Sequence, residues 1–591
     1  MTATAQLRIL ETTDLHMHLL GYDYHADRPD PARGLAPLCD VISARRRAAP
    51  GATLLFDNGD FFQGTPLADS LAHAGDHPLA AAFNTLGYDA VTLGNHEFDY
   101  GIPALAGFLA QLDCPVVSAN AESPDPTWLP ATILTRPLVC SDGRTRTIRI
   151  GVTGFAPPSL TRACGLHVRS MTAALAQSLP ALKDADLVVA LCHGGLDDAR
   201  TPAPESANAI AQAAGVHVVL MGHTHDVFPA GRNRVTRDVD EATGTIHGKP
   251  AVMAGCHGGY LGEIDLTLTH DKSGWQVRDG NSRLHPNGQT DLPTSPARTA
   301  IEALAAPHHA RMQSQMQTPI GKTDRLLHNR FATILPDPVG QLFADVMRRA
   351  VTRALDAPCD IAAVAPFQLA GMQGRHLDIA LPAGPLTRRD AARLFPYSDR
   401  LRAVRRTGRE LRDWLERSAA NYVHLTDRSE APPLIVPDSA GYHRDALFGL
   451  QYDIDLGLPP CFDLAGLRIR GGVGRVRNIR LHGQPLHDDA DYVVATTDFR
   501  AGGAGGYPPI PEVAALWRSP TGLRDILIEA IGDGAALDLV PAPVWRFCAP
   551  RGQAVRIDAG QTPVPASQSE IPPGWTAITG EETAGGWLMH F

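Results

Sequence analysis

The chain has 591 residues, with 53 basic and 63 acidic side chains, and its formal net charge is −10 when histidine is counted as neutral. Hydrophobic residues make up 44% of the sequence and charged residues 20%, which is typical of globular proteins and argues against a mainly disordered chain. The acidic balance also disfavours general binding to a nucleic acid polymer, because such binding needs a basic surface.

Residues 1–280 alternate short apolar runs with polar or helical segments, a pattern typical of an α/β fold. Each apolar run is followed by a polar or glycine-rich loop, and in open α/β sheets functional sites gather at the carboxyl ends of the strands. The runs that we interpret as buried strands are Leu7–Leu10, Thr53–Phe56, Ala90–Leu93, Val116–Ser118, Ile148–Thr153, Leu187–Leu191, Val216–Leu220 and Ala251–Ala254.

A hydrophilic, proline-rich stretch near Asn281–Pro296 ends this region. Ser295 and Pro296 signal the start of a helix, and the segment Ala297–Gln317 is a candidate linker helix with a break at Pro307. We therefore expect a first domain over residues 1–290, a linker over 291–322, a second domain over 323–558 and a tail over 559–591.

The expected second domain begins with a helical stretch, Val339–Leu355. Its later part holds strand-like runs at Arg475–Ile479 and Tyr492–Thr496, followed by the glycine-rich loop Arg500–Tyr507. The tail is rich in proline, glycine, threonine and glutamate, and is either loose or an appended strand.

Five short polar clusters follow five of the predicted strands in the first half. Each alone is a weak signal, because an isolated histidine at a strand end is usually structural. Together they offer carboxylate, imidazole and amide ligands, which suit divalent metals such as Zn, Mn, Fe or Co. In chain order, the clusters are Asp14-Leu15-His16, Asn58-Gly59-Asp60, Gly94–Asp99, Cys192–Gly195 and Gly222–His225. We expect Asp14 and His16 to lie on extended backbone, where side chains two residues apart point the same way and can bind one cation.

The order D-x-H, GD, GNHE, H and GHxH resembles the calcineurin-like metallophosphoesterase family. The resemblance implies an N-terminal four-layer α/β/β/α sandwich and two divalent ions, and we expect the second domain to be a separate C-terminal α/β substrate-binding domain. The ions, whose identity among Zn, Mn, Co and Fe stays open, activate water and bind phosphoryl oxygens. It assigns Asp60 to both ions, and it assigns one ion to Asp14, His16 and His225 and the other to Asn95, His193 and His223.

His96 follows one of these ligands directly, and Asp99 comes three residues later. An aspartate at that distance can orient the imidazole and hold it charged. We expect His96 to stabilise a phosphoryl oxygen or to protonate the leaving group, with Asp99 as its partner. The alternative is that Asp99 only caps a helix.

The second domain resembles the C-terminal domain of the 5′-nucleotidase family. Three stretches carry this resemblance: Ala365–Phe367, Leu394–Glu416 and Val494–Pro508. In that family two aromatic rings enclose the nucleobase, and the matching positions are Tyr397 and Phe499, with Tyr442 as a rival for the first. The alternative is that these rings belong to the core.

Glu11–His16, Tyr22–Tyr24 and Gly222–Pro229 are similar to stretches of the bifunctional 2′,3′-cyclic-nucleotide 2′-phosphodiesterase/3′-nucleotidases. The resemblance implies opening of a 2′,3′-cyclic nucleotide to a 3′-nucleotide, followed by release of the nucleoside. A 5′-nucleotidase or UDP-sugar hydrolase is the alternative enzyme, and a nucleotide-binding protein with a vestigial metal site is the alternative of another class.

Two features depart from that subfamily. Residues Gly255–Tyr260 read GCHGGY where an aromatic-rich stretch is expected, and His257 within them is a candidate lining residue. Members of the subfamily are usually exported to the periplasm, whereas no export signal is present here, so we expect a cytoplasmic location, with the periplasm as the alternative. No run of about 18 apolar residues occurs. We expect a monomer that binds nucleotides, and neither a nucleic acid polymer nor a membrane.

Overall fold

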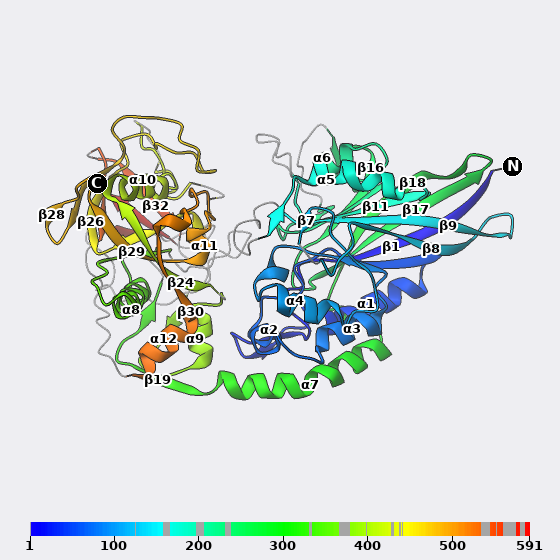
Figure 1. Ribbon diagram of the computed structural model, residues 1–591, viewed down its shortest axis with the longest axis horizontal. Coiled ribbons are helices and arrows are strands. Elements are labelled where there is room, and N and C mark those ends of the chain that lie inside the picture. Colours follow the sequence, from blue (N-terminus) through cyan, green and yellow to red (C-terminus); the bar gives the residue numbers. More distant parts are fainter. Residues whose placement is uncertain are drawn as a thin grey trace. The chain divides into compact units, whose positions relative to one another are not determined.

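The structure is a computed structural model that describes residues 2–123, 126–157, 166–196, 206–230, 238–329, 332, 334–365, 379–397, 399–426, 431–436, 439, 441–533, 544–550, 552–558, 575–578 and 586–591. The chain folds into two compact units, Met1–Met316 and Gln317–Phe591, each of which is described separately below (Figure 1). In these described ranges, none of the helices has the length and apolar character needed to cross a membrane.

The first unit contains two large β-sheets. One has the strand order β18-β17-β1-β4-β5-β6, and the other has the order β14-β15-β16-β12-β11-β9-β8. The first sheet is made of β1 (Ala3–Thr12), β4 (Ala52–Asp57), β5 (Ala90–Thr92), β6 (Val116–Val117), β17 (Tyr260–Asp271) and β18 (Gly274–Pro286). The second is made of β8 (Ala131–Val139), β9 (Thr145–Phe155), β11 (Leu187–Cys192), β12 (Val218–Met221), β14 (Val239–Asp240), β15 (Thr245–Ile246) and β16 (Lys249–Ala254), together with β13 (Val227–Phe228), which pairs with β16.

The strands in the middle of each sheet run parallel to one another, as in the pairs β1–β4, β4–β5, β9–β11 and β11–β12. Such strands are buried on both faces, which is why they appear in the sequence as continuous apolar runs. All eight predicted strands are confirmed. The long antiparallel pair β17–β18 was not predicted, because its burial alternates along the chain and β18 is largely polar.

The two sheets share one apolar core, to which Ile9 and Phe56 contribute from the first sheet and Val189 and Leu220 from the second. A second core lies between the outer face of the β9–β11–β12 sheet and helices α5 (Met171–Ser178) and α6 (Ala207–Gln212). Helices α1 (Leu35–Arg47), α3 (Pro78–Leu86) and α4 (Ile102–Leu109) lie on the side of the first sheet (Figure 1). The predicted α/β/β/α architecture is therefore confirmed.

The expected break in the linker helix is wrong. Helix α7 runs without interruption over Pro296–Met316 with Pro307 inside it, and it packs on α1 and α3 of the first unit. A proline within a helix removes one backbone hydrogen bond. One face of α7 is buried at Ile301, Ala305, Met312 and Met316, and this packing on both sides of the proline keeps the helix continuous.

The second unit is built around a mixed five-stranded sheet with the order β25-β21-β29-β24-β30. Its strands are β21 (Ile361–Val364), β24 (Arg400–Thr407), β25 (Ala446–Phe448), β29 (Asp491–Thr497) and β30 (Ala515–Gly522). A second sheet of this unit has four strands, β26 (Leu450–Asp455), β27 (Val476–Leu481), β28 (Gln484–Pro485) and β31 (Trp545–Cys548). The helices of this unit are α8 (Pro338–Leu355), α9 (Arg388–Leu394), α10 (Gly408–Ala419), α11 (Asp498–Ala501) and α12 (Leu523–Gly532).

The predicted helix at Val339–Leu355 and the predicted strands at Arg475–Ile479 and Tyr492–Thr496 are confirmed as α8, β27 and β29. The last strands of the chain, β33 (Trp575–Ile578) and β34 (Gly586–His590), join β32 (Ala554–Asp558) in a three-stranded sheet. Pro366 and Phe367, which belong to one predicted motif, lie outside the described residues.

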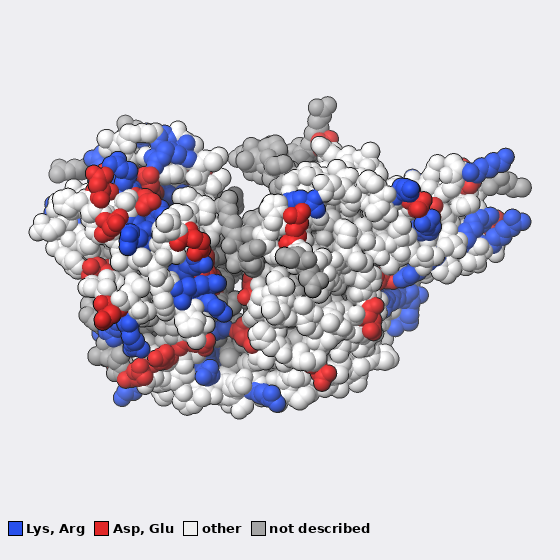
Figure 2. All heavy atoms as spheres, viewed as in Figure 1, with Lys and Arg blue, Asp and Glu red and all other residues white. Residues whose placement is uncertain are grey.

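Acidic and basic side chains are interspersed on the face of the second unit that Figure 2 shows. Ion pairs in this unit include Arg402–Asp498 and Arg518–Asp498. Mixed signs of this kind cancel locally, so the visible face of this unit does not present one extended field of a single sign.

Candidate metal centre

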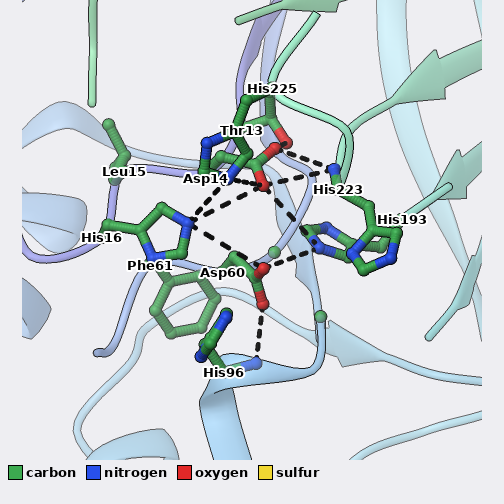
Figure 3. A network of polar contacts seen from close by, with 12 residues as sticks. Thr13, Asp14, Leu15, His16, Asp60, Phe61, His96, His193, His223 and His225 are labelled. Atoms are coloured by element: carbon green, nitrogen blue, oxygen red, sulfur yellow. Dashed lines mark hydrogen bonds and ion pairs between the residues drawn. The ribbon is translucent and has the colours of Figure 1, made fainter. Parts of the chain in front are cut away.

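The five predicted clusters follow strands β1, β4, β5, β11 and β12. In each sheet these strands are parallel, so their carboxyl ends lie at one edge. Figure 3 shows side chains from both sheets converging there, with Asp14 and His16 after β1, Asp60 after β4, His193 after β11, and His223 and His225 after β12.

Six of the seven predicted ligands form two adjoining groups. Asp14, His16 and His225 have ligand atoms within 4.8 Å of one another, and so do Asp60, His193 and His223. The groups meet where His193 Nε2 lies 3.8 Å from Asp14 Oδ1 and His16 Nε2 lies 4.0 Å from Asp60 Oδ2. Side chains distant in sequence thus surround one small region.

The expectation that Asp14 and His16 lie on extended backbone is wrong. Strand β1 ends at Thr12, and φ is 50° at Asp14 and 45° at His16. Asp60, His223 and His225 also have left-handed φ values of 57°, 73° and 57°. Residues other than glycine adopt this conformation only when the surrounding structure compensates for the strain, and such residues cluster at functional sites.

Backbone carbonyls orient two of the histidines. His16 Nδ1 lies 2.9 Å from the Gln63 carbonyl oxygen, and His193 Nδ1 lies 2.6 Å from that of Asn58. A carbonyl can only accept, so each Nδ1 carries a proton and donates it, which leaves Nε2 of both rings as the nitrogen that can bind a cation at the centre. Metal-binding histidines are typically fixed in this way.

Two glycines allow the close approach of backbone to the centre. A β-carbon on Gly94 would lie 2.3 Å from Asp60 Oδ1 and 2.6 Å from His193 Nε2. A β-carbon on Gly222 would lie 2.3 Å from Thr13 Oγ1 and 2.7 Å from Asp14 Oδ2. Any side chain at these positions would push the ligand groups out of place.

Asn95, the seventh predicted ligand, follows β5 directly after Gly94. Its Oδ1 atom is buried and has no hydrogen-bond partner among the described residues. The next residue, His96, donates its backbone N–H to Asp60 Oδ1 at 2.7 Å, which ties this loop to the centre. A buried amide oxygen without a partner is costly, and a cation would satisfy it.

Charges in the centre complement one another. Burial alone would raise the pKa of Asp14 and Asp60, but facing histidines keep both pKa values lowered, with His193 the largest of these influences. Burial alone would lower the pKa of His193 and His225, but Asp60 and Asp14 respectively raise them. The two carboxylates thus attract positive charge, which divalent cations can supply. The donor set therefore fits divalent metal ions.

His96 and Asp99 are paired at the edge of the centre. His96 Nδ1 lies 2.7 Å from Asp99 Oδ2, and the His96 ring packs against the His16 ring with centroids 5.1 Å apart. Burial lowers the pKa of His96, but Asp99 and Asp60 outweigh it and raise the pKa to about 10. Asp99 follows the short turn His96–Phe98, and the next helix is capped by Gly101, so Asp99 does not cap that helix.

Sequence reasoning gave Glu97 no role, yet it organises the centre. Its two carboxylate oxygens accept from four backbone N–H groups, those of Asp60, Phe61, Phe62 and Gly94, at 2.6 to 3.1 Å. The side chain therefore ties the loop after β4 to the loop after β5. Its place in the GNHE motif was the available signal, but three of its four partners are 35 to 37 residues away in the chain and could not be identified.

Glu11 was also missed. Its side chain is fully buried, and the N–H of Met221 donates to its carboxylate at 3.1 Å. This bond joins β1 of one sheet to β12 of the other. Burial raises the pKa of Glu11 well above its usual range.

In the second unit, the predicted base-binding residues Tyr397 and Phe499 are each 41% exposed, unlike core aromatics. The backbone N–H of Phe499, in helix α11, donates to Asp399 Oδ1 at 3.2 Å, which links this helix to the loop that carries Tyr397. The rival residue, Tyr442, is 37% exposed and lies edge-on to Phe499 with centroids 6.0 Å apart. The three rings therefore gather at one exposed part of this unit.

Comparisons with known proteins agree with this geometry. Residues 7–227 match the family model "Calcineurin-like phosphoesterase", and residues 319–512 match "5′-nucleotidase, C-terminal domain". The chain is 31% identical over 560 residues to the 2′,3′-cyclic-nucleotide 2′-phosphodiesterase/3′-nucleotidase of Salmonella typhimurium, covering 90% of this chain and 86% of the relative. The chain therefore belongs to the family of the 2′,3′-cyclic-nucleotide 2′-phosphodiesterase/3′-nucleotidases.

A second member of the 2′,3′-cyclic-nucleotide 2′-phosphodiesterase/3′-nucleotidase family, from Yersinia enterocolitica, is 32% identical over 528 residues, which cover 84% of this chain and 81% of that protein. The fold matches a putative 5′-nucleotidase from Staphylococcus aureus, solved in complex with alpha-ketoglutarate, with a TM-score of 0.73 and 20% identity over 92% of this chain and 100% of that one. The family assignment makes the chain a metallophosphoesterase of a class that uses divalent metal ions, and the His/Asp groups of the first unit can bind such ions.

Proposed function

We propose that this chain hydrolyses 2′,3′-cyclic nucleotides to 3′-nucleotides and then 3′-nucleotides to nucleosides. The observation that carries the proposal is the meeting of two ligand groups, around Asp14 and around Asp60, at the carboxyl edges of both sheets. Two relatives that align with about nine-tenths of this chain, at 30 and 31% identity, bear names stating this pair of activities.

We assign seven side chains to two divalent ions, with Asp60 shared between them: Asp14, His16, Asp60 and His225 for one, and Asp60, Asn95, His193 and His223 for the other. Bound there, the ions supply a hydroxide at neutral pH and neutralise charge on the phosphoryl oxygens. The fixed tautomers of His16 and His193 present Nε2 without rearrangement, which keeps the site preorganised for an anionic substrate.

His96 serves the phosphoryl group in this proposal. Asp99 occupies Nδ1 of the ring and favours the charged imidazolium, so Nε2–H is the donor that remains. It donates to a phosphoryl oxygen or to the oxygen that leaves as the ester bond breaks. Asp99 acts through His96 by holding the orientation of its ring.

Tyr397 and Phe499 recognise the nucleobase by stacking. Ring-on-base stacking is worth about 1–3 kcal/mol and accepts any base, so the two residues would bind nucleotides with little base preference. Their high exposure and the hydrogen bond that links the backbone of Phe499 to Asp399 beside Tyr397 support this role. Tyr442, which packs against Phe499, is the alternative partner for the base.

A substrate panel tests the proposal. The purified protein, supplied with Mn²⁺ or Co²⁺, is given 2′,3′-cyclic AMP, 3′-AMP, 5′-AMP and UDP-glucose, and released nucleoside and phosphate are measured. We expect turnover of the first two and slower or no turnover of the others. If 5′-AMP alone is hydrolysed, the 5′-nucleotidase alternative is correct, and if none is hydrolysed while metal is bound, the proposal fails.

A further inference from the structure

The loop Gly255–Tyr260, which follows β16, lies against the metal centre through backbone contacts. His257 donates its N–H to the Asp14 carbonyl oxygen at 2.7 Å, and its own carbonyl accepts from the N–H of Gly34 at 2.8 Å. Gly255 and Gly258 have left-handed φ values of 71° and 66°, and a β-carbon on Gly258 would lie 3.1 Å from the backbone of Gly34. The loop is therefore held in one place beside the ligand groups.

This loop brings two further potential ligands to His225. The ligand atoms of His225, Cys256 and His257 lie within 4.8 Å of one another, and a side-chain hydrogen bond joins Cys256 to His225. Thiolate and imidazole ligands stand about 2.3 and 2.0 Å from a zinc ion, so small side-chain rotations suffice to bring the three onto one cation. His18 stacks on the His257 ring with centroids 4.1 Å apart and supports its orientation.

We propose that His225, Cys256 and His257 form a separate cation position that takes thiophilic divalent cations such as Zn²⁺, Cd²⁺ or Co²⁺. The two groups around Asp14 and Asp60 combine carboxylates with imidazoles and contain no sulfur. A sulfur ligand favours softer cations, whereas carboxylate-containing sites also accept hard ones such as Mn²⁺. The proposed position therefore differs from the other two groups in the ions it prefers.

The two groups around Asp14 and Asp60 are called the paired centre below. Occupation of the proposed position competes with the paired centre, because His225 belongs both to the proposed position and to the group around Asp14. Its Nε2 lies 2.9 Å from His16 Nε2 and 3.2 Å from Asp14 Oδ1. A neutral imidazole offers one lone pair and binds one ion at a time. A thiophilic cation held by Cys256 and His257 therefore draws His225 away from the group that contains Asp14 and His16. Binding of the cation itself does not depend on which nucleotides the protein hydrolyses.

Cobalt absorption spectroscopy tests the proposal on the full-length protein. Co²⁺ is titrated into the metal-free protein, and the near-ultraviolet band of thiolate-to-cobalt charge transfer is followed. We expect this band in the unaltered protein and in Cys114→Ser, which removes another half-buried free thiol. We expect no band in Cys256→Ser, and in His257→Ala at least a tenfold weaker Co²⁺ affinity at this band. No band in the unaltered protein, or an unchanged band in Cys256→Ser, overturns the proposal.

Variants of the paired centre show whether the position is separate. In His16→Ala and in the isosteric Asp14→Asn, the charge-transfer band should persist, because neither residue belongs to the group around Cys256. Loss of the band in both variants, with the thermal transition of the first unit retained, would make Cys256 a ligand of the paired centre and overturn the separate position. A protein that shows the band but hydrolyses no nucleotide would disprove the proposed function alone.

Discussion

Glu97 offers a test of how the centre is held together. In Glu97→Gln, one of the two carboxylate oxygens becomes an NH₂ group, which faces two backbone N–H donors instead of accepting from them. A buried donor without an acceptor costs about 1–3 kcal/mol, so two of them should destabilise the first unit by roughly 2–6 kcal/mol. The affected donors are those of Asp60 and Gly94 if Oε2 is replaced, or those of Phe61 and Phe62 if Oε1 is replaced.

The assay is urea denaturation of the metal-free protein, followed by hydrogen exchange at the amides of residues 60 to 62. Burial and the nearby Asp60 raise the pKa of Glu97 to about 7, so the measurement is made at pH 8, where the side chain is ionised. We expect an earlier transition of the first unit, faster exchange at these amides and weaker binding of Mn²⁺. Glu302→Gln, on an exposed position of α7, is the matched control and should change little.

This reasoning would be refuted if Glu97→Gln had the same stability in urea, the same amide hydrogen exchange rates and the same Mn²⁺ affinity as the unaltered protein. Such a result would mean that the four short N–H contacts to Glu97 do not hold the loops after β4 and β5. The place of Asp60 in the centre would then need another explanation.

Three further predictions concern the centre, the base site and the core. Gly94→Ala places a methyl group 2.3 Å from Asp60 Oδ1, and it should weaken Mn²⁺ binding, measured by calorimetry, about 10- to 100-fold. The control is Gly107→Ala, whose methyl group would meet no atom within 4 Å and should leave Mn²⁺ binding unchanged. Phe499→Ala should raise the KM for 3′-AMP about 5- to 150-fold, because one stacking contact with the base is lost. The KM for p-nitrophenyl phosphate, which has no base, should rise less. Equal effects on both substrates would contradict the stacking role. Glu263 is buried, and although burial raises the pKa of its carboxyl, His285, Arg45 and Arg8 lower it from 4.5 to about 2. Because the folded-state pKa is depressed, the carboxylate stabilises the fold by roughly 3 kcal/mol above pH 4.5, and this contribution is lost as the pH falls from about 4.5 toward 2. Glu263→Gln should therefore be less stable than the unaltered protein at pH 7 in urea, and the gap should shrink by roughly half at pH 3, whereas a gap that is constant with pH would show that the ion pairs contribute nothing.

Much of the fold and the general position of the centre could be predicted from the sequence, for a physical reason. Strands buried on both faces must be apolar throughout, so β4, β11 and β12 are visible as short apolar runs. The polar residues directly after such runs then fall at the same edge of a sheet. Asp14 and Asp60 could be grouped on that basis, whereas His193 follows a strand of the other sheet and could be placed with them only through the family resemblance.

The conformation of the loops could not be predicted, because contacts distant in sequence determine it. The N–H groups of Asp14 and His16 donate to the carbonyls of Gly59 and Asp60, each at 2.8 Å. These bonds pair the loop after β1 with the loop after β4 and hold both residues in the left-handed region. A single loop read in isolation looks extended, which is why the geometry of the D-x-H cluster was predicted wrongly.

The continuity of α7 through Pro307 has the same origin. The local signal for a break is sound, since proline removes a backbone donor. The burial of Ile301 and Met312 on either side of Pro307 outweighs the loss of this hydrogen bond. That burial depends on helices α1 and α3, which come from elsewhere in the chain.

The assignment of two ions to seven side chains is tested most directly by anomalous diffraction from crystals grown with Mn²⁺. Two manganese peaks are expected in the first unit, one contacting Asp14, His16 and His225 and the other contacting Asn95, His193 and His223, with Asp60 between them. A single peak, no peak, or peaks that do not contact Asp60 would contradict the account.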